Sequence, residues 1–276
     1  YNVILDARDI DPADPRGLGI DGSIGQNVEI SGNVLAHQRS GTGNTKGINI
    51  GGNYAGLLVH DNVVYDWVQA VNNQAPALAL EGLPLGLVRV YNNQFQQPNG
   101  AIYQQINPVP FGMYAYSGNK YAAANNQPFI ESVGWLSYAQ WVLFSGETGS
   151  AMGALPYLDP NRTIETYMAS LGGSPSLGAF MAEARRQSHA NWRAAYTAQS
   201  VSQYIRAGFT LPVASGENCP ADLNGDGIVS IADVITFMNF FAASNPRANC
   251  DLSTTTPILN ANDFACFLNK LAQGCH

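Results

Sequence analysis

Charged residues are scarce in this chain, and basic ones especially so. Only 12 % of the 276 residues are charged, and 20 Asp and Glu against 13 Lys and Arg give a net charge of −7. A nucleic-acid-binding protein would carry a basic stripe, so this balance argues against that class. No stretch approaches the roughly 18 uninterrupted apolar residues that cross a bilayer, so we expect no membrane span. No signal peptide opens the chain, and we expect residue 1 to be a mature or truncated start.

Cysteine is absent from the first 218 residues. The four cysteines are Cys219, Cys250, Cys266 and Cys275. Such clustering favours a small C-terminal domain held by two disulfides in an oxidising compartment, and so a secreted or cell-surface protein. Four reduced core thiols are the alternative. A zinc site is disfavoured because no CxxC or Cys/His pair of the usual spacing is present.

Hairpin turns of the NG and DG type are also scarce, whereas a weak repeat runs through residues 18–121. Four segments align on Asn33, Asn62, Asn93 and Asn119, at intervals of 29, 31 and 26 residues. Apolar residues recur five and three positions before each asparagine and two after it. The aligned sets are Val28/Leu57/Val88/Tyr114, Ile30/Val59/Val90/Tyr116 and Leu35/Val64/Phe95/Tyr121. This alternation predicts short strands with one buried face, stacked coil upon coil.

A second family of strands is predicted before the first. It is carried by the pairs Leu18/Ile20, Ile48/Ile50 and Leu78/Leu80. We expect each repeated asparagine to occupy the left-handed conformation of a sharp turn, and the stacked asparagines to hydrogen-bond as a ladder. The pattern resembles that of right-handed parallel β-helix proteins. We therefore predict a mainly β fold with such a helix over residues 1–158, with a β-sandwich as the alternative.

From residue 159 the sequence changes to helical patterns. Thr163 is expected to cap a helix over residues 164–171, Ser174 and Pro175 to begin a second that ends at Arg186, and Thr197 to open a third closed by Gly208. We predict that residues 159–209 form an α-helical C-terminal cap over the last coil, and that residues 129–144 form a last irregular coil or edge. The segment resembles the tails of secreted right-handed β-helix proteins of planctomycete-type bacteria. Residues 210–218 are a predicted linker.

Residues 222–233 fit the EF-hand calcium loop. Oxygen side chains stand at loop positions 1, 3 and 5, a glycine stands at position 6, and the carbonyl of position 7 is expected to point inward. Calcium requires six to eight oxygen ligands, several of them charged. The predicted ligands are Asp222, Asn224, Asp226, Ile228, Ser230 and Asp233.

The second half of the C-terminal region repeats the first about thirty residues later. Val234, Phe237, Met238 and Phe241 align with Phe264, Phe267, Leu268 and Leu271, which predicts two short helices packed face to face. The second loop departs from the pattern, because Asp251 lies one residue early and Pro257 replaces the turn glycine. Its candidate ligands are Asp251, Ser253, Thr255, Ile258, Asn260 and Asp263. The loop either binds calcium in a bulged form, which we favour, or is a structural relic.

This duplicated pattern over residues 219–276, ending in Gly274-Cys275, resembles small all-α dockerin domains of the planctomycete type. The resemblance implies calcium as cofactor and a cohesin-like or other surface protein as partner. In dockerins the two ends of the module lie together. That suggests disulfides between Cys219 and Cys275 and between Cys250 and Cys266.

No catalytic signature is present in the sequence. Outward-facing candidates on the coils are His37, Arg39, Lys46, His60, Asp61, Asp66 and Arg89, with Glu29 equivalent to Arg89 two coils apart. A lyase would need a base and a cation beside a uronate, and a glycosidase two carboxylates, for which Asp61 with Asp66 is a weak pair. Three hypotheses follow: a surface-anchored protein that acts on or binds polysaccharide, a non-catalytic structural or adhesive subunit of an extracellular assembly, and a calcium-dependent binding module.

Overall fold

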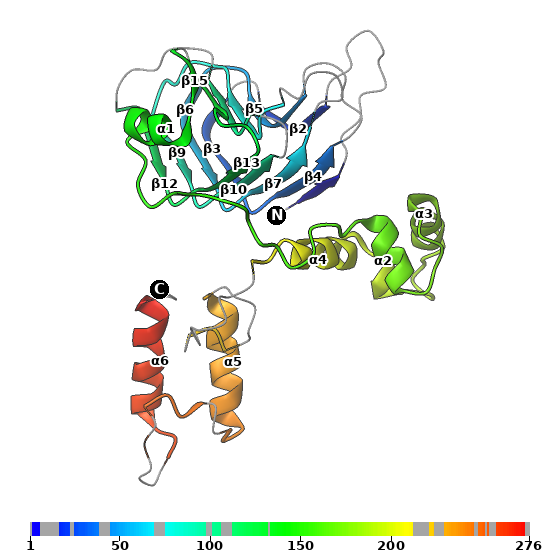
Figure 1. Cartoon of the computed structure of the whole chain (residues 1–276). Helices are drawn as coiled ribbons and strands as arrows, with labels where there is room; N and C mark the ends of the chain where they lie inside the picture. The colour runs from blue at the N-terminus through cyan, green and yellow to red at the C-terminus, as the bar shows by residue number, and fades with distance from the viewer. Residues whose placement is uncertain are drawn as a thin grey trace. The chain divides into compact units, whose positions relative to one another are not determined.

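The computed structural model divides the chain into two compact units, Tyr1–Phe209 and Thr210–His276. The first unit contains a parallel β-solenoid and a group of helices, and the second contains two helices (Figure 1). The structure describes residues 2–5, 17–22, 25–38, 45–68, 75–97, 101–105, 112–131, 133–211, 221–223, 229–245, 248–251, 253 and 258–273.

Three sheets form the sides of the solenoid, and each coil adds one strand to each sheet. Sheet A has the order β1 (Val3–Leu5), β4 (Val34–Gln38), β7 (Val63–Trp67), β10 (Gln94–Gln97), β13 (Lys120–Ala123) and β16 (Ala151–Met152). Sheet B has the order β2 (Gly17–Gly22), β5 (Thr45–Ile50), β8 (Leu78–Leu80), β11 (Tyr103–Gln105), β14 (Phe129–Glu131) and β15 (Gly134–Leu136). Sheet C consists of β3 (Gly25–Ser31), β6 (Tyr54–His60), β9 (Val88–Tyr91) and β12 (Tyr114–Ser117).

The strand pairing confirms the predicted parallel stacking and its register. Val28 pairs with Leu57, which pairs with Val88, and Leu35 pairs with Val64, which pairs with Phe95. These side chains form one buried core along the solenoid axis. All named strands pair in parallel except β14 and β15, which are antiparallel and end sheet B. The right-handedness of the coil stays a prediction, supported by the strong preference of parallel crossovers for that hand.

The expected asparagine ladder is present at the turn between sheets C and A. The Oδ1 atom of Asn62 accepts hydrogen bonds from the backbone N–H and the Nδ2 of Asn33, at 3.1 and 2.9 Å. Asn62 donates in the same way to Asn93, and Asn93 to Asn119. The ladder asparagines are at most 4 % exposed, so these bonds satisfy backbone and amide groups that are shielded from solvent.

The expectation that these asparagines take the left-handed conformation was wrong. The residue directly before each one has positive φ instead. These residues are Gly32 (62°), Asp61 (53°), Asn92 (54°) and Gly118 (64°). The physical reason is that two residues form the turn. The first reverses the chain through its positive φ, and the second directs its side-chain amide into the ladder.

The ladder ends on a carboxylate. Glu147 Oε1 accepts from Asn119 Nδ2 at 2.7 Å, 28 residues after that asparagine. The same carboxylate accepts from the Tyr121 hydroxyl and from Trp141 Nε1, and Glu147 is 4 % exposed. Burial raises the pKa of Glu147, and its hydrogen bonds offset part of that rise.

The last coil is covered by α1 (Tyr138–Ser145), not by the helices after residue 159. Ser137 caps α1 with a full capping box, and Gly146 ends it in the left-handed conformation. The Trp141 ring stacks on Phe129 of β14, with centroids 4.9 Å apart. Of the two forms expected for residues 129–144, an irregular coil or an edge, the structure has the edge: a hairpin that ends sheet B, followed by a capping helix.

The helices after residue 159 form a group, of which the last lies beside the first strand of sheet A. They are α2 (Ile164–Ser170), α3 (Leu177–Arg185), the 3-10 turn η1 (Ala194–Tyr196) and α4 (Ala198–Gly208). Thr163 and Thr197 are the N-caps of α2 and α4 as predicted, whereas α3 begins after Ser176. Arg206 Nη1 donates to the Gly32 carbonyl at 2.6 Å, which attaches α4 beside the first coils. The predicted position of these helices over the last coil was wrong, because the aromatic surface that receives them lies on sheet A.

The second unit contains α5 (Ile231–Ala242) and α6 (Ala261–Gln273). Phe237 and Phe267 stack with centroids 4.4 Å apart, which brings the two helices side by side as predicted. Val234, Phe241 and Leu271 pack around this pair. Met238 and Leu268, expected in the same contact, are 53 % and 40 % exposed.

Candidate functional site

Two of the candidate residues on sheet A hold the flanking helices. His37 Nε2 lies 2.8 Å from the Pro160 carbonyl oxygen and donates to it, and Nδ1 lies 3.9 Å from an Asp66 carboxylate oxygen. The His37 ring packs on Tyr65 and near Phe209. This contact gives His37 and Asp66 a structural role between the solenoid and α4.

Another candidate, Lys46, lies on β5 of sheet B. Lys46 is 4 % exposed, and its Nζ lies 2.5 Å from Glu81 Oε1. Lys46 is therefore already paired with Glu81 of the next coil. Removing either partner would leave the other charge unpaired in a poorly solvated place. Arg39 lies outside the described residues.

Three further candidates, Glu29, His60 and Asp61, form a network on the outer face of sheet C. His60 Nδ1 lies 2.6 Å from Asp61 Oδ2, and His60 Nε2 lies 3.1 Å from Glu29 Oε1. The His60 ring stacks on Tyr91, with centroids 4.6 Å apart. A hydrogen bond from Ser31 and a second from His60 lower the pKa of the exposed Glu29 carboxyl.

This sheet C network lies on an open surface. Strand pairing places Glu29, Leu58 and Arg89 in one outward row, which confirms the predicted equivalence of Glu29 and Arg89. Asp61 bonds to His60, whereas Asp66 faces His37, so the two aspartates belong to separate networks and do not form the pair required by a glycosidase.

A pocket that the sequence did not predict lies where the solenoid meets α1. It has a volume of about 390 Å³, within the range of small-molecule sites. Strands β11, β14 and β12 supply its polar groups, and α1 supplies an apolar wall. Its lining residues are Gln105, Gly112, Tyr114, Tyr116, Glu131, Trp141, Leu143, Phe144, Ser145 and Gly146. We call this cavity the aromatic pocket.

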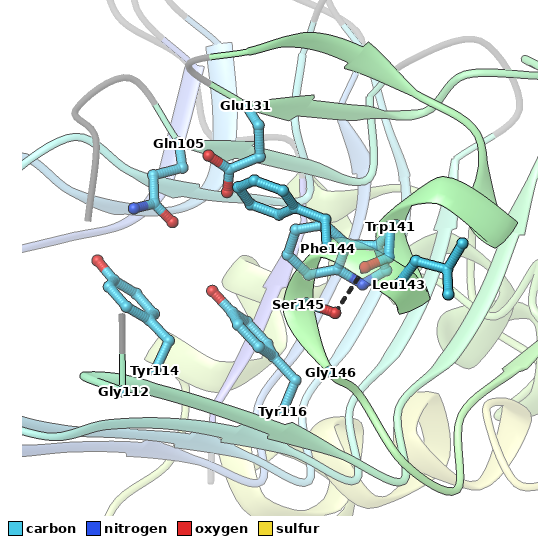
Figure 2. Close-up of a pocket in the computed structure, with 10 residues that line it drawn as sticks. All are labelled: Gln105, Gly112, Tyr114, Tyr116, Glu131, Trp141, Leu143, Phe144, Ser145 and Gly146. Atoms are coloured by element: carbon cyan, nitrogen blue, oxygen red, sulfur yellow. Dashed lines mark hydrogen bonds between the residues drawn. The ribbon is translucent and has the colours of Figure 1, made fainter. Parts of the chain in front are cut away.

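Four polar groups converge in the aromatic pocket. Figure 2 shows the Gln105 amide, the Glu131 carboxylate and the hydroxyls of Tyr114 and Tyr116 pointing toward one space. The pocket thus combines hydrogen-bonding groups from two sheets, which is the arrangement that fixes the orientation of a polar ligand.

The tyrosines of the pocket are held by a chain of hydroxyl contacts. The Tyr114 hydroxyl lies 2.5 Å from that of Tyr54, and the Tyr116 hydroxyl lies 2.7 Å from that of Tyr103. Tyr103 also donates to Gln105 Oε1 at 2.5 Å. Burial above all raises the pKa of both Tyr114 and Tyr116, so both phenols stay neutral at physiological pH.

The aromatic rings present parallel faces. Tyr114 and Tyr116 stand two residues apart on β12, with ring centroids 5.9 Å apart and an interplanar angle of 9°. Phe144 is 43 % exposed, whereas Trp141 is 1 % exposed and forms the floor behind it. The signal in the sequence was the concentration of aromatic residues between positions 103 and 144.

The first calcium loop is described in part. Asn224, Asp226 and Ile228 lie outside the described residues. Asp233 is fully buried, and its Oδ2 accepts from the backbone N–H of Ser230 at 2.8 Å. A buried carboxylate at loop position 12 fits a calcium ligand, because the cation would compensate the cost of removing that charge from water.

The second loop repeats this geometry thirty residues later. Asp263 is fully buried, and its Oδ2 accepts from the backbone N–H of Asn260 at 2.8 Å. Its Oδ1 accepts from the backbone N–H groups of Cys250 and Asp251. Asp263 thus takes the position of Asp233, as the sequence alignment predicted.

Calcium itself stays a prediction. Thr255 lies outside the described residues, and Asp222, Ser253 and Ile258 lie inside them. Within the described part of the chain, no three His, Cys, Asp or Glu side chains gather into a metal site.

One of the two expected disulfides is present. Cys250 and Cys266 are bonded, with Cα atoms 5.9 Å apart, and the bond ties the second loop to α6. The pairing of Cys219 with Cys275 lies outside the described residues.

Comparison with known proteins adds no relative to this picture. No family model, curated protein or solved structure matches the chain. None of the helices that the structure describes has the length and apolar character needed to cross a membrane. Function is therefore inferred from the geometry of the chain itself.

Proposed function

We propose that this chain is an extracellular, surface-attached β-solenoid that binds polysaccharide. The aromatic pocket is its sugar-binding site, and the C-terminal unit is a dockerin-like, calcium-dependent attachment module. The observation that carries the proposal is the convergence of Gln105, Glu131, Tyr114 and Tyr116 beside the exposed Phe144 ring.

The chemistry of the pocket suits a sugar. A pyranose ring has apolar C–H faces that pack on aromatic rings and a rim of hydroxyls that need donors and acceptors. The exposed Phe144 ring supplies the first, and the Gln105 amide, the Glu131 carboxylate and the tyrosine hydroxyls supply the second. A pocket that is part apolar and part polar matches such a ligand on both counts.

Binding without catalysis is the form of the proposal that the pocket supports. Glycoside hydrolysis needs two carboxylates about 5–10 Å apart, and Glu131 is the one carboxylate among the pocket residues that the structure describes. A lyase needs a cation beside the uronate, and the described part of the lining includes no Lys, Arg or His.

Calorimetric titration of the full chain with a panel of oligosaccharides tests the binding. We expect at least one oligosaccharide to bind, and Tyr114→Ala to weaken it by tenfold or more, about 1.4 kcal/mol. Tyr91→Ala, on the outer face of sheet C, is the matched control and should leave the affinity unchanged. Failure of every oligosaccharide to bind, or equal affinity of the Tyr114 variant, would refute the proposal.

Attachment is the role proposed for the C-terminal unit. Its helices expose Ile231, Ile235 and Met238 along one side of α5, at 73 %, 56 % and 53 %. An apolar stripe of this kind supports protein contact. The contact is either a cohesin-like surface partner or, in the second candidate function, another copy of this chain in an extracellular assembly.

Chelation of calcium tests the second unit independently of the first. The four tryptophans, Trp67, Trp135, Trp141 and Trp192, all lie in the first unit. We expect EDTA to lower the melting temperature of α5 and α6, which amide hydrogen exchange measures. The thermal transition of the first unit, measured by tryptophan fluorescence, should stay unchanged. Unchanged exchange in α5 and α6 after EDTA would rule out the calcium module.

A further inference from the structure

The helices after residue 159 have a net charge opposite to that of the chain as a whole. Five arginines and three carboxylates give residues 159–209 a net charge of +2, whereas the whole chain carries −7. Three of these arginines, Arg185, Arg186 and Arg193, stand within nine residues, at the end of α3 and in the turn after it. We call residues 185–193 the arginine turn. An anionic partner is therefore the kind that this surface of an acidic protein attracts.

One carboxylate serves two guanidinium groups at the arginine turn. Glu183 Oε1 lies 2.8 Å from Arg186 Nη1, and Glu183 Oε2 lies 2.7 Å from Arg193 Nη1. A hydrogen bond from Arg193 above all lowers the pKa of the Glu183 carboxyl, so this group is ionised at neutral pH. The three side chains together keep one positive charge, and the exposed Arg185 adds a second.

The same turn displays a tryptophan to solvent. Trp192 is 67 % exposed, although its ring is among the largest apolar surfaces that a side chain can bury. The backbone beside it is held in place: Gln187 Nε2 donates to the Tyr196 carbonyl at 2.9 Å, and the Arg193 N–H donates to Gln187 Oε1 at 2.8 Å. Tryptophan and arginine are the side chains enriched at binding hot spots, and here both stand exposed on one ordered turn.

An acidic sugar fits both features of the turn. A pyranose ring has C–H faces that pack on an aromatic ring, and a uronate adds a carboxylate to that ring. A guanidinium matches the two oxygens of a carboxylate with two parallel N–H groups. Arg186 and Arg193 already hold one carboxylate, that of Glu183, and the Arg186 side chain is still 70 % exposed. The turn thus offers a uronate both a ring face and a matching cation.

We propose that the arginine turn binds a uronate polysaccharide, with a sugar ring on Trp192 and sugar carboxylates on Arg185 and Arg186. The site is separate from the aromatic pocket, because none of residues 185–193, all of which the structure describes, lines that cavity. The inference therefore goes beyond the proposed function and does not depend on it.

The test compares two forms of one oligosaccharide on the unmodified full chain. Hexagalacturonate and its methyl ester have the same sugar rings and differ in charge. In calorimetric titrations at about 50 mM NaCl, we expect the acid to bind at least about tenfold tighter than the ester. The affinity for the acid should fall at least about threefold at about 300 mM NaCl, because salt screens exposed charges. Equal affinities of acid and ester, or no binding of the acid, would overturn the inference.

Two substitutions at exposed positions locate the site. We expect Trp192→Ala to weaken hexagalacturonate binding at least about tenfold, and Arg185→Gln to weaken it at least about threefold. Trp135→Ala, at another exposed tryptophan, and Arg89→Gln, at an exposed arginine of sheet C, are the matched controls and should leave the affinity unchanged. Unchanged affinity in Trp192→Ala would overturn the assignment to the arginine turn.

A variant of the aromatic pocket distinguishes the two sites. Tyr114→Ala should leave the affinity for hexagalacturonate unchanged. A loss of affinity in Tyr114→Ala, with none in Trp192→Ala, would place the acidic sugar in the aromatic pocket, which overturns this inference and leaves the proposed function intact. Binding of hexagalacturonate that depends on Trp192, when Tyr114→Ala weakens no oligosaccharide, would support this inference and overturn the proposed one.

An acidic peptide tests the other class of partner. Hexaglutamate carries carboxylates without sugar rings, so we expect it to bind at least about tenfold more weakly than hexagalacturonate. Equal or tighter binding of hexaglutamate would assign the turn to an acidic protein and overturn the inference.

Discussion

Replacing Asn62 by alanine removes the central member of the asparagine ladder. Its Oδ1 accepts two hydrogen bonds from Asn33, and its Nδ2 donates to the Ile30 and His60 carbonyls and to Asn93. Asn62 is fully buried, so water does not replace these partners. The substitution therefore leaves the backbone N–H and the side-chain amide of Asn33 without the acceptor that both use, in a site shielded from solvent.

The magnitude follows from those two groups. A buried polar group that loses its partner costs about 1–3 kcal/mol, and the space left by the amide adds to this. We expect Asn62→Ala to lower the free energy of unfolding of the first unit by about 3–5 kcal/mol, a large part of the 5–15 kcal/mol typical of a domain. Asn62→Asp should cost as much, because an ionised carboxylate cannot donate to either carbonyl.

Urea unfolding followed by tryptophan fluorescence measures this effect, since all tryptophans lie in the first unit. The exposed Asn161, in the turn before α2, provides the matched control Asn161→Ala, which should change stability by less than about 0.5 kcal/mol. A loss below about 1 kcal/mol for Asn62→Ala would show that the ladder does not stabilise the coils and would refute the reasoning.

Two further predictions concern the carboxylate that ends the asparagine ladder and the disulfide of the second unit. Burial raises the folded-state pKa of Glu147, so its contribution to stability is present below the unfolded pKa, about 4.3, and is lost as pH rises through the folded value. Lowering the pH from 7.5 to 4.5 should therefore stabilise the natural chain relative to Glu147→Gln in urea unfolding, and a constant difference would contradict the raised pKa. Replacing both Cys250 and Cys266 by serine opens a loop of 16 residues and should cost the second unit about 3 kcal/mol, seen as faster amide exchange in α6. Unchanged exchange there would show that the disulfide adds no stability.

The repeat of the solenoid was predictable because its signal is periodic. Each coil places an apolar residue five positions before an asparagine, and the observed pairing of Val28, Leu57 and Val88 follows that alignment. The two helical N-caps at Thr163 and Thr197 were equally readable, because a cap is a local feature.

The aromatic pocket was not predictable in the same way. Gln105, Tyr114, Glu131 and Trp141 come from four elements, and their meeting depends on how α1 covers the last coil. His37 shows the converse: its outward position on the strand was readable, but its contact with the Pro160 carbonyl joins residues 123 positions apart. Sequence patterns report local geometry, whereas both of these features depend on tertiary packing.

The most direct test of carbohydrate binding in the aromatic pocket uses Trp141 as a reporter. Replacing Trp135 and Trp192 by phenylalanine leaves two tryptophans, and of these Trp141 lines the pocket whereas Trp67 is buried in the solenoid core. Titration of this variant with the oligosaccharide that binds most tightly in calorimetry and loses affinity in Tyr114→Ala should give a saturable change in fluorescence with the same dissociation constant. Calorimetric binding without any fluorescence change would place the sugar elsewhere, and the absence of both signals with every oligosaccharide would contradict the proposed function.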